Sequence, residues 1–242
     1  MENPLIIENL FKTFNKRGKF PTKALNDVSF KLNPSEVTGL IGPNGAGKTT
    51  MMRIVLGFET YDSGNVLCFG ESPVSINAKK EIGFQSDSQF RSKTIKVKEY
   101  LQIQSKLAGF CKNDEQIDNY LEIFHLSNAA GKSLVSLSRG MRQKIELIQA
   151  FLGNPRMVIL DEPTAGLDPP SVFELRDFIN HQKQNGITVL FSSHHLSEVE
   201  KVCDRVLFIQ EGKLEGDYHL KDLEAGFLEE AFKKYEQERR FV

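Results

Sequence analysis

The feature that most constrains this chain is a glycine-rich run, Gly42-Pro43-Asn44-Gly45-Ala46-Gly47-Lys48-Thr49-Thr50. It fits the pattern G-x-x-x-x-G-K-S/T, which is typical of a phosphate-binding loop. The apolar run Val37–Ile41 before it predicts a buried strand, and Lys48–Gly57 after it predicts a helix that ends at the glycine. This is the strand, loop and helix context that the pattern requires, so we predict that the nine residues bind a nucleotide.

The chemistry of this loop follows from its backbone. Glycine at positions 42, 45 and 47 lets the chain curl so that successive N–H groups point inward and form an anion-binding nest. The N-terminus of the following helix adds the positive end of its dipole. We expect the Lys48 ammonium to reach the β- and γ-phosphates of ATP, and the Thr49 hydroxyl to ligate Mg²⁺. A glycine-rich turn with a solvated lysine is the alternative, but it leaves the flanking strand and helix unexplained.

The composition of the chain limits its partners and its location. Lysine plus arginine is 31 and aspartate plus glutamate is 32, so the net charge of −1 gives no global electrostatic reason to expect nucleic acid. The three cysteines have no zinc-ligand spacing and suggest no disulfide framework, which is typical of reduced thiols in the cytosol. The first nine residues lack the features of a signal peptide, and no apolar run approaches the ~20 residues that cross a bilayer. We expect a cytoplasmic protein, which is compatible with a membrane partner.

The order of the predicted elements indicates an α/β protein. Strands are expected at Leu5–Leu10 and Asn26–Leu32, and the second alternates apolar and polar residues as a strand with one buried face does. Between residues 88 and 155 the pattern becomes helical, with helices expected at about Val97–Ala108, Asn113–Phe124 and Arg139–Leu152. We expect Asn113 and Ser138 to cap the second and third of these helices. After residue 155 strands and helices alternate again, which favours a parallel sheet.

An acidic pair follows one of the later strands. Met157–Leu160 is an apolar run that ends in Asp161 and Glu162. Ligands of such sheets bind at the carboxyl ends of the strands, where the phosphate loop and His194 are also expected. We expect Asp161 to reach the Mg²⁺ region and Glu162 to polarise a water for in-line attack on the γ-phosphate. Alone, such a pair is often only a turn, but the phosphate loop favours the catalytic interpretation.

Four further segments carry a resemblance to one family. Residues 137–143 (LSRGMRQ) resemble the signature motif of ATP-binding cassette (ABC) ATPases, and they precede segments similar to that family's Walker B, D-loop and H-loop, at residues 160–164, 165–169 and 192–194. Their order and spacing match along roughly residues 1–215. The resemblance implies an α/β fold, a P-loop NTPase core with a mostly parallel sheet, an N-terminal antiparallel β part and an α-helical subdomain inserted at about 88–155. Residues 216–242 are expected to form a charged, helical C-terminal tail.

The resemblance also implies a function. It implies a Mg²⁺-dependent ATPase subunit of a transporter, peripheral on the inner face of the cell membrane, that drives a separate transmembrane permease. Two such chains, identical or different, would bind two ATP molecules head to tail, and each site would use the phosphate loop of one chain and the signature of the other. Closure of this dimer on ATP would drive the export of an unknown substrate.

The signature segment makes physical sense in that arrangement. Ser138 and Gly140 at a helix start offer a hydroxyl, backbone N–H groups and a dipole, which would complete the γ-phosphate site of the other chain. Arg139 and Met141 stand where the family usually has glycine and glutamine. Similar departures resemble exporters of the drug and peptide-antibiotic kind more than importers. Whether Arg139 and Met141 contact the nucleotide, or only belong to a serine-capped helix, stays open.

Position by position, the resemblance assigns further roles. Phe14 falls where the family has its base-stacking aromatic residue, with Phe20 as the weaker candidate. His194 matches the switch histidine, a donor to the γ-phosphate, and fits that register better than His195. Asp168 is expected to act across the dimer and to communicate between its two sites.

The Q-loop is the poorest match to the family. Counting back from Val97, Asp87 aligns with the residue that contacts Mg²⁺ and the attacking water. Gln85, two residues earlier, has the more natural chemistry. We favour Asp87 as a metal ligand and keep Gln85 as the alternative, and either could instead be a solvated loop residue.

Two other classes of function stay open on the sequence. A soluble ABC ATPase could serve as a scaffold or assembly factor rather than as a transporter motor. A nucleotide-gated interaction protein with little catalysis is the other class, although the intact Glu162 and His194 argue against it.

Overall fold

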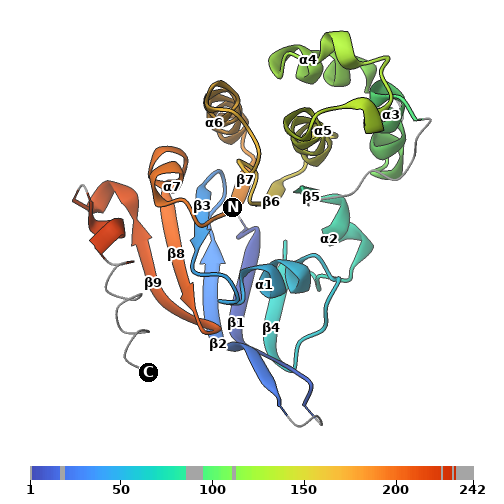
Figure 1. Cartoon of the computed structure of the whole chain (residues 1–242). Coiled ribbons are helices and arrows are strands. Elements are labelled where there is room, and N and C mark those ends of the chain that lie inside the picture. The colour runs from blue at the N-terminus through green and yellow to red at the C-terminus, as the bar shows by residue number, and fades with distance from the viewer. Residues whose placement is uncertain are drawn as a thin grey trace.

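The mostly parallel sheet at the centre of the structure organises the other elements (Figure 1). The computed structural model describes residues 2–16, 20–85, 95–110, 113–224, 226–230 and 232. Within these ranges a six-stranded sheet has the order β5-β6-β7-β3-β8-β9, with the bounds Ile82–Gln85, Met157–Asp161, Thr188–Ser193, Val37–Ile41, Arg205–Gln210 and Lys213–His219. Neighbouring strands from β5 to β8 are parallel, and β9 pairs antiparallel with β8.

A second sheet is antiparallel and comes mainly from the N-terminal part of the chain. Its order is β2-β1-β4, with the bounds Thr22–Leu32, Leu5–Phe14 and Ser63–Cys68. The first two strands are longer than their hydrophobic pattern predicted, because pairing continues from Leu5 opposite Leu32 to Phe14 opposite Thr22. The predicted fold class, with a mostly parallel sheet and an antiparallel N-terminal part, is therefore confirmed.

The central strands are apolar along their length because both faces of the large sheet are covered. Along β3, Val37 and Ile41 lie in one hydrophobic cluster and Leu40 lies in the other. One cluster contains α1 (Lys48–Val55), which lies between the two sheets. The other contains residues of five helices on the opposite face, namely α3 (Val97–Leu107), α4 (Asp114–Ile123), α5 (Arg139–Phe151), α6 (Pro169–Gln184) and α7 (Leu196–Val202). Burial on both faces explains continuous apolar runs rather than alternation.

The helices between β5 and β6 pack onto α6 through aromatic side chains. Tyr120 of α4, Phe124 at the C-terminal cap of that helix and Phe151 of α5 each make an edge contact with Phe178 of α6, with ring centroids 5.1, 5.0 and 4.9 Å apart. Shorter helical elements are α2 (Ile76–Lys80), η1 (Ser127–Ala129), η2 (Leu134–Ser136) and η3 (Leu220–Asp222). In the described ranges, no helix combines the length and the apolar character needed to cross a membrane.

The caps of two predicted helices have different outcomes. The Ser138 hydroxyl accepts a hydrogen bond from the Met141 N–H at 3.2 Å, so the predicted N-cap of α5 is confirmed. Asn113 precedes α4 as expected, but its amide donates to the Gln116 side chain at 2.7 Å and caps no backbone N–H. That prediction was wrong because the backbone of Asn113, with ψ of 21°, lacks the extended geometry of a capping residue.

The C-terminal tail begins as a strand. We expected a helical tail from residue 216, but β9 continues to His219, because its alternating exposed and half-buried residues suit an edge strand. After η3, residues 227–230 are helical, and Leu228 is buried in the core. Phe232 contacts Phe208, with ring centroids 6.0 Å apart. Residues 233–242 lie outside the described part of the chain.

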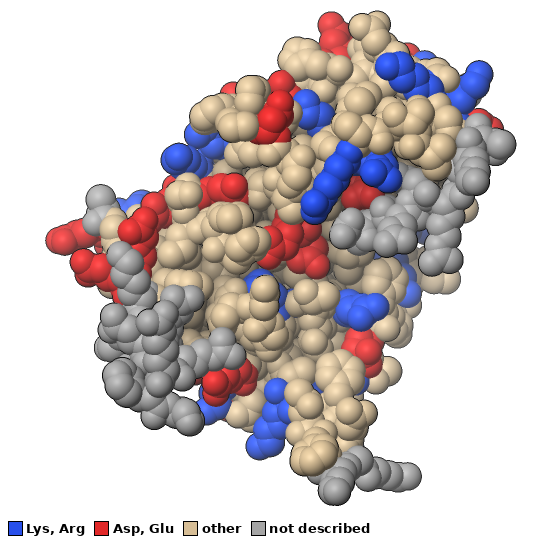
Figure 2. Space-filling view, viewed as in Figure 1, with Lys and Arg blue, Asp and Glu red and all other residues tan. Residues whose placement is uncertain are grey.

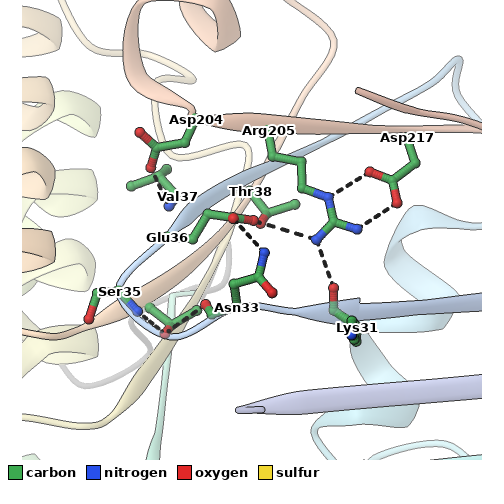
Figure 3. A network of polar contacts seen from close by, with 10 residues as sticks. Lys31, Asn33, Ser35, Glu36, Val37, Thr38, Asp204, Arg205 and Asp217 are labelled. Carbon is green, nitrogen blue, oxygen red and sulfur yellow. Dashed lines mark hydrogen bonds and ion pairs between the residues drawn. The ribbon is translucent and has the colours of Figure 1, made fainter. Parts of the chain in front are cut away.

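A buried arginine ties several strands together (Figure 3). Arg205, at the start of β8, donates through its guanidinium to both Asp217 oxygens on β9, at 2.6 and 2.5 Å. The same group donates to the Lys31 carbonyl on β2 at 2.9 Å and lies 3.6 Å from the Glu36 carboxylate. The hydrogen bonds and charges of these carboxylates raise the pKa of Arg205, although burial opposes them. This network joins the two sheets at the end away from the candidate site.

Charged side chains of both signs are interspersed on the face shown in Figure 2. Over the described residues of that face, the basic side chains form no continuous surface. This distribution agrees with the net charge of −1.

Candidate functional site

A pocket of about 540 Å³ lies at the carboxyl ends of β3, β6 and β7. This is the edge at which parallel sheets bind ligands. The structure brings together most of the residues predicted from separate motifs, which line the pocket as Phe14, Asn44, Gly45, Ala46, Gly47, Lys48, Thr49, Thr50, Asp161, Glu162 and His194. Thr22, Lys23 and Ala24 of β2 also line it, and sequence reasoning did not find them because their place depends on the long-range pairing of β2 with β1.

Two glycines of the loop are required by space as well as by backbone conformation. Gly47 has φ of +109°, and a Cβ atom there would lie 2.5 Å from the Ala24 carbonyl oxygen. A Cβ atom on Gly42 would lie 2.1 Å from the Ile209 carbonyl oxygen. Any side chain at either position would push the loop away from the strands beneath it. The loop conformation is therefore fixed by packing before any ligand binds.

Lys48 lies in the floor of the pocket. Its ammonium donates to the carbonyl oxygens of Gly42 at 2.6 Å and Pro43 at 3.2 Å, so these two loop residues support the pocket without lining it. Burial lowers the pKa of Lys48, and the Glu162 and Asp161 carboxylates act in the opposite direction. The ammonium is thus held by uncharged acceptors, in a place where a negatively charged phosphate would be a better partner.

The acidic pair is held by a serine of the neighbouring strand. The Ser192 hydroxyl, completely buried in β7, donates to Asp161 Oδ1 at 2.7 Å and accepts from the Glu162 N–H at 2.9 Å. The sequence did not predict this contact, because the position of a serine two residues before His194 does not indicate which groups its hydroxyl bonds. One side chain therefore orients both acidic residues.

Glu162 and His194 face each other at the open side of the pocket. His194 Nδ1 lies 2.5 Å from Glu162 Oε2, and the two side chains are 50% and 29% exposed. The His195 ring lies against that of His194 at a tilt of 41°, with ring centroids 4.0 Å apart, and does not line the pocket. The placement supports the predicted register, in which His194 is the site histidine.

Phe14 lies at the end of β1, opposite Thr22, and one side of its ring faces a cation. Lys12 Nζ lies 4.8 Å from the Phe14 ring centroid and 2.7 Å from Glu59 Oε1. Phe20, the weaker candidate, is 77% exposed and does not line the pocket. Phe14 is thus the aromatic residue available to a base in this pocket.

The signature residues do not line this pocket. Ser138 is exposed at the N-terminus of α5, and Gly140 packs so closely that a Cβ atom would lie 3.2 Å from the Gly166 carbonyl oxygen. Asp168 begins α6, where its Oδ1 accepts from the Ser171 N–H at 3.2 Å, and hydrogen bonds from Ser171 lower the pKa of Asp168. Within one chain, Ser138, Gly140 and Asp168 therefore all lie outside the pocket that holds the phosphate loop.

The third predicted metal ligand is not placed. Asp87 lies outside the described residues. The alternative, Gln85 at the end of β5, is buried and does not line the pocket, and neither polar atom of its amide has a hydrogen-bond partner in the part of the chain that the structure describes. Thr49 and Asp161 do line the pocket and offer a hydroxyl and a carboxylate oxygen, which are donors that Mg²⁺ accepts beside phosphate and water.

A larger hollow of about 860 Å³ lies between α4 and the end of α6. Asparagine and glutamine side chains dominate its wall, and some bond one another, as Gln116 does with Asn154 at 2.6 Å. None of the predicted site residues lies there. This hollow therefore adds no residue to the predicted nucleotide site.

A glycine loop that follows the parallel strand β3, with an acidic pair at the end of β6, two places along the same sheet, defines a P-loop nucleotide-binding protein. The family model described as "ABC transporter" matches residues 25–165. The chain belongs to this family, as an ATP-binding subunit with ATPase activity.

Individual relatives agree with this assignment. The chain is 37% identical over 226 residues to the uncharacterised ABC transporter ATP-binding protein YhcH of Bacillus subtilis (strain 168), covering 92% of this chain and 72% of the relative. It is 34% identical to the lipopolysaccharide export system ATP-binding protein LptB of Escherichia coli (strain K12), covering 87% and 88%. Among solved structures, the ATP-binding subunit of an ABC transporter superposes with a TM-score of 0.83 and 26% identity, covering 90% of each chain.

Proposed function

We propose that this chain is the motor subunit of an exporter, working as a head-to-tail pair of cassettes on a separate transmembrane permease at the inner face of the cell membrane. The observation that carries the proposal is the separation of two anion-binding surfaces in one chain. The pocket holds the phosphate loop, whereas Ser138 is exposed, Gly140 is half-buried, and both lie outside it. A second cassette, of the same or another sequence, would place its own signature segment, which corresponds to Ser138 and Gly140 here, over this pocket.

The residues of the pocket divide the binding of ATP among them. The loop N–H groups and Lys48 bind the phosphates, and Phe14 stacks on the base with the face that Lys12 leaves free. Thr49 and Asp161 would hold Mg²⁺, with Asp87 as a further predicted ligand. Bound there, Mg²⁺ would neutralise charge on the β- and γ-phosphates.

Hydrolysis is assigned to the pair at the open side of the pocket. Glu162 orients the attacking water and receives its proton, while His194 donates to the γ-phosphate. The water oxygen bonds to the γ-phosphorus as the bond from that phosphorus to the bridging oxygen breaks, which releases ADP and phosphate. The 2.5 Å contact between Glu162 and His194 means that one chain holds both side chains in place before a second cassette binds.

Two further parts of the proposal are the role of Asp168 across the dimer and the direction of transport. Asp168, like Ser138, is exposed and does not line the pocket, which suits a residue that acts across the dimer. Arg139 and Met141 in the signature support an exporter of the drug or peptide-antibiotic kind, and the export function in the name of LptB supports the direction alone. The substrate would be selected by the permease.

The Glu162→Gln variant tests the proposal. It should bind ATP as the wild type does, hydrolyse it about 10²-fold to 10⁴-fold more slowly, and stay dimeric with ATP in size-exclusion chromatography. A variant that stays monomeric with ATP and hydrolyses it normally would contradict the mechanism.

A second experiment separates the motor from a soluble scaffold or assembly factor. The chain is purified from detergent-solubilised membranes of its own cells through an affinity tag. A motor brings with it a stoichiometric polytopic membrane protein, whereas a scaffold brings only soluble partners.

A further inference from the structure

The backbone of Glu162 has an unusual conformation. Its φ is +52°, in the left-handed region that residues with a side chain seldom adopt. Such a conformation persists only where the surroundings impose it, and it often marks a functional residue. The question is which groups hold the Glu162 peptide in place.

One side of Glu162 is held from β7. The Glu162 N–H donates to the Ser192 hydroxyl at 2.9 Å, and the same hydroxyl donates to Asp161 Oδ1 at 2.7 Å. Ser192 is completely buried, so no water competes for these bonds. Ser192 therefore fixes the peptide N–H on the N-terminal side of Glu162.

The other side of Glu162 is held from α5. Gln143, also buried, donates through Nε2 to the Pro163 carbonyl at 3.0 Å and, at a longer 3.4 Å, to the Glu162 carbonyl. Gln143 lies on the helix that begins after Ser138, within two turns of the surface offered to the second cassette. The Gln143 side-chain amide thus fixes the carbonyl groups on the C-terminal side of Glu162.

We propose that Ser192 and Gln143 are positioning residues that together hold Glu162 for hydrolysis. The proposal rests on the proposed function, in which Glu162 orients the attacking water. It also gives the signature helix a direct connection to the backbone of the catalytic glutamate of its own chain. A second cassette whose nucleotide docks on Ser138 would press on the helix that holds the carbonyls of Glu162 and Pro163.

Matched variants of the full chain test the serine. Ser192→Ala should lower kcat at least 10-fold while KM for ATP changes less than 3-fold, because the phosphate loop is intact. Ser192→Thr retains a hydroxyl and should restore most of the rate. Ser193→Ala is the control, because this serine is equally buried on the same strand but accepts from the His195 N–H instead.

Matched variants also test the glutamine. Gln143→Met keeps the length of the side chain, removes the donor and should lower kcat with little change in KM. Gln149→Met is the control on the same helix, where the amide contacts the Tyr100 hydroxyl instead. Because Ser192 and Gln143 hold the same residue from its two sides, the double variant Ser192→Ala/Gln143→Met should lose less than the product of the two single effects.

The thermal unfolding midpoint and the affinity for a fluorescent ATP analogue are measured for every variant. A lower kcat with the midpoint and affinity of the controls supports the proposal. The proposal would be overturned if Ser192→Ala kept the wild-type kcat, or if Ser192→Ala and Gln143→Met lost no more activity than their controls Ser193→Ala and Gln149→Met. In either case Glu162→Gln would still block hydrolysis, so the proposed function would stand. If the wild type hydrolyses no ATP, the proposed function itself fails.

Discussion

His194 Nδ1 lies 2.5 Å from Glu162 Oε2, across the mouth of the nucleotide pocket. The two residues come from the ends of adjacent parallel strands, β7 and β6, which brings them together without any help from a ligand. Both side chains keep partial access to solvent, as a residue that contacts water or phosphate must. The pair is thus preassembled on the rigid part of the fold.

Replacing the histidine should affect the chemical step more than binding. His194→Ala should lower kcat by about 100-fold or more, because it removes a donor to the γ-phosphate, while the affinity for ATP stays close to that of the wild type. A phosphate-release assay with a fluorescent-nucleotide titration measures both. His195→Ala is the matched control, and equal losses in the two variants would contradict the assignment of His194.

The contact of Lys12 with Glu59 should make stability depend on pH. The hydrogen bond from Lys12 lowers the pKa of Glu59 in the folded protein, and burial opposes it. The pair therefore adds stability above the ordinary pKa of glutamate, and this contribution is lost as the pH falls through the lower folded value. Lys12→Met should lower the unfolding midpoint at about pH 7, and the difference from the wild type should shrink below about pH 4.

Calorimetry across this range checks that prediction. Lys16→Met is the control, because the ion pair of Lys16 with Asp62 is far more exposed on its lysine side and should contribute little. A difference between Lys12→Met and the wild type that stays constant into the acid range would show that the ion pair is not its source.

The Arg205 network should stabilise the fold because each of its charges has a partner of opposite sign. Arg205→Met leaves the carboxylates of Asp217 and Glu36 without their shared cation and should lower the free energy of unfolding by about 3–5 kcal/mol. The double variant Arg205→Met/Asp217→Leu should lose less, because one stranded charge is removed with the arginine. Urea denaturation measures both, with Lys183→Met as a control for the more exposed ion pair with Asp204. A loss below about 1 kcal/mol in Arg205→Met would be no larger than that of a surface pair and would contradict this account.

Local patterns in the sequence predicted the elements that local physics determines. The glycine loop, the strand before Asp161 and Glu162, and the three helices between residues 88 and 155 follow from spacing and apolar periodicity within short windows. The start of the tail was predicted wrongly, because residues 213–219 become a strand only by pairing with β8. Edge pairing of this kind depends on the partner strand as well as on the segment itself.

The contacts that support the site residues could not be predicted from the sequence, because they join residues that are far apart in the chain. Ser192 is 30 residues from Glu162, and Gln143 is 20 residues from Pro163, so no window of sequence contains either contact. Thr22 to Ala24 enter the pocket only through the register of β2 with β1. Motif spacing can name the residues that meet the ligand, whereas the residues that hold them emerge from tertiary packing.

Complementation between two inactive variants tests most directly the central claim, that each ATP site is shared between two chains. Lys48→Ala damages the phosphate loop but leaves the signature surface. Ser138→Asp keeps a good N-cap for α5 but places a negative charge where the γ-phosphate of the other chain would dock. Each variant alone should be nearly inactive.

The measurement is the phosphate-release rate of an equimolar mixture of the two variants, allowed to exchange subunits. Head-to-tail sharing predicts that mixed dimers hold one intact site, made from the loop of the Ser138→Asp chain and the signature of the Lys48→Ala chain. With random pairing, the mixture should recover up to about a quarter of the wild-type rate. A mixture no more active than the sum of its two components would contradict the shared site.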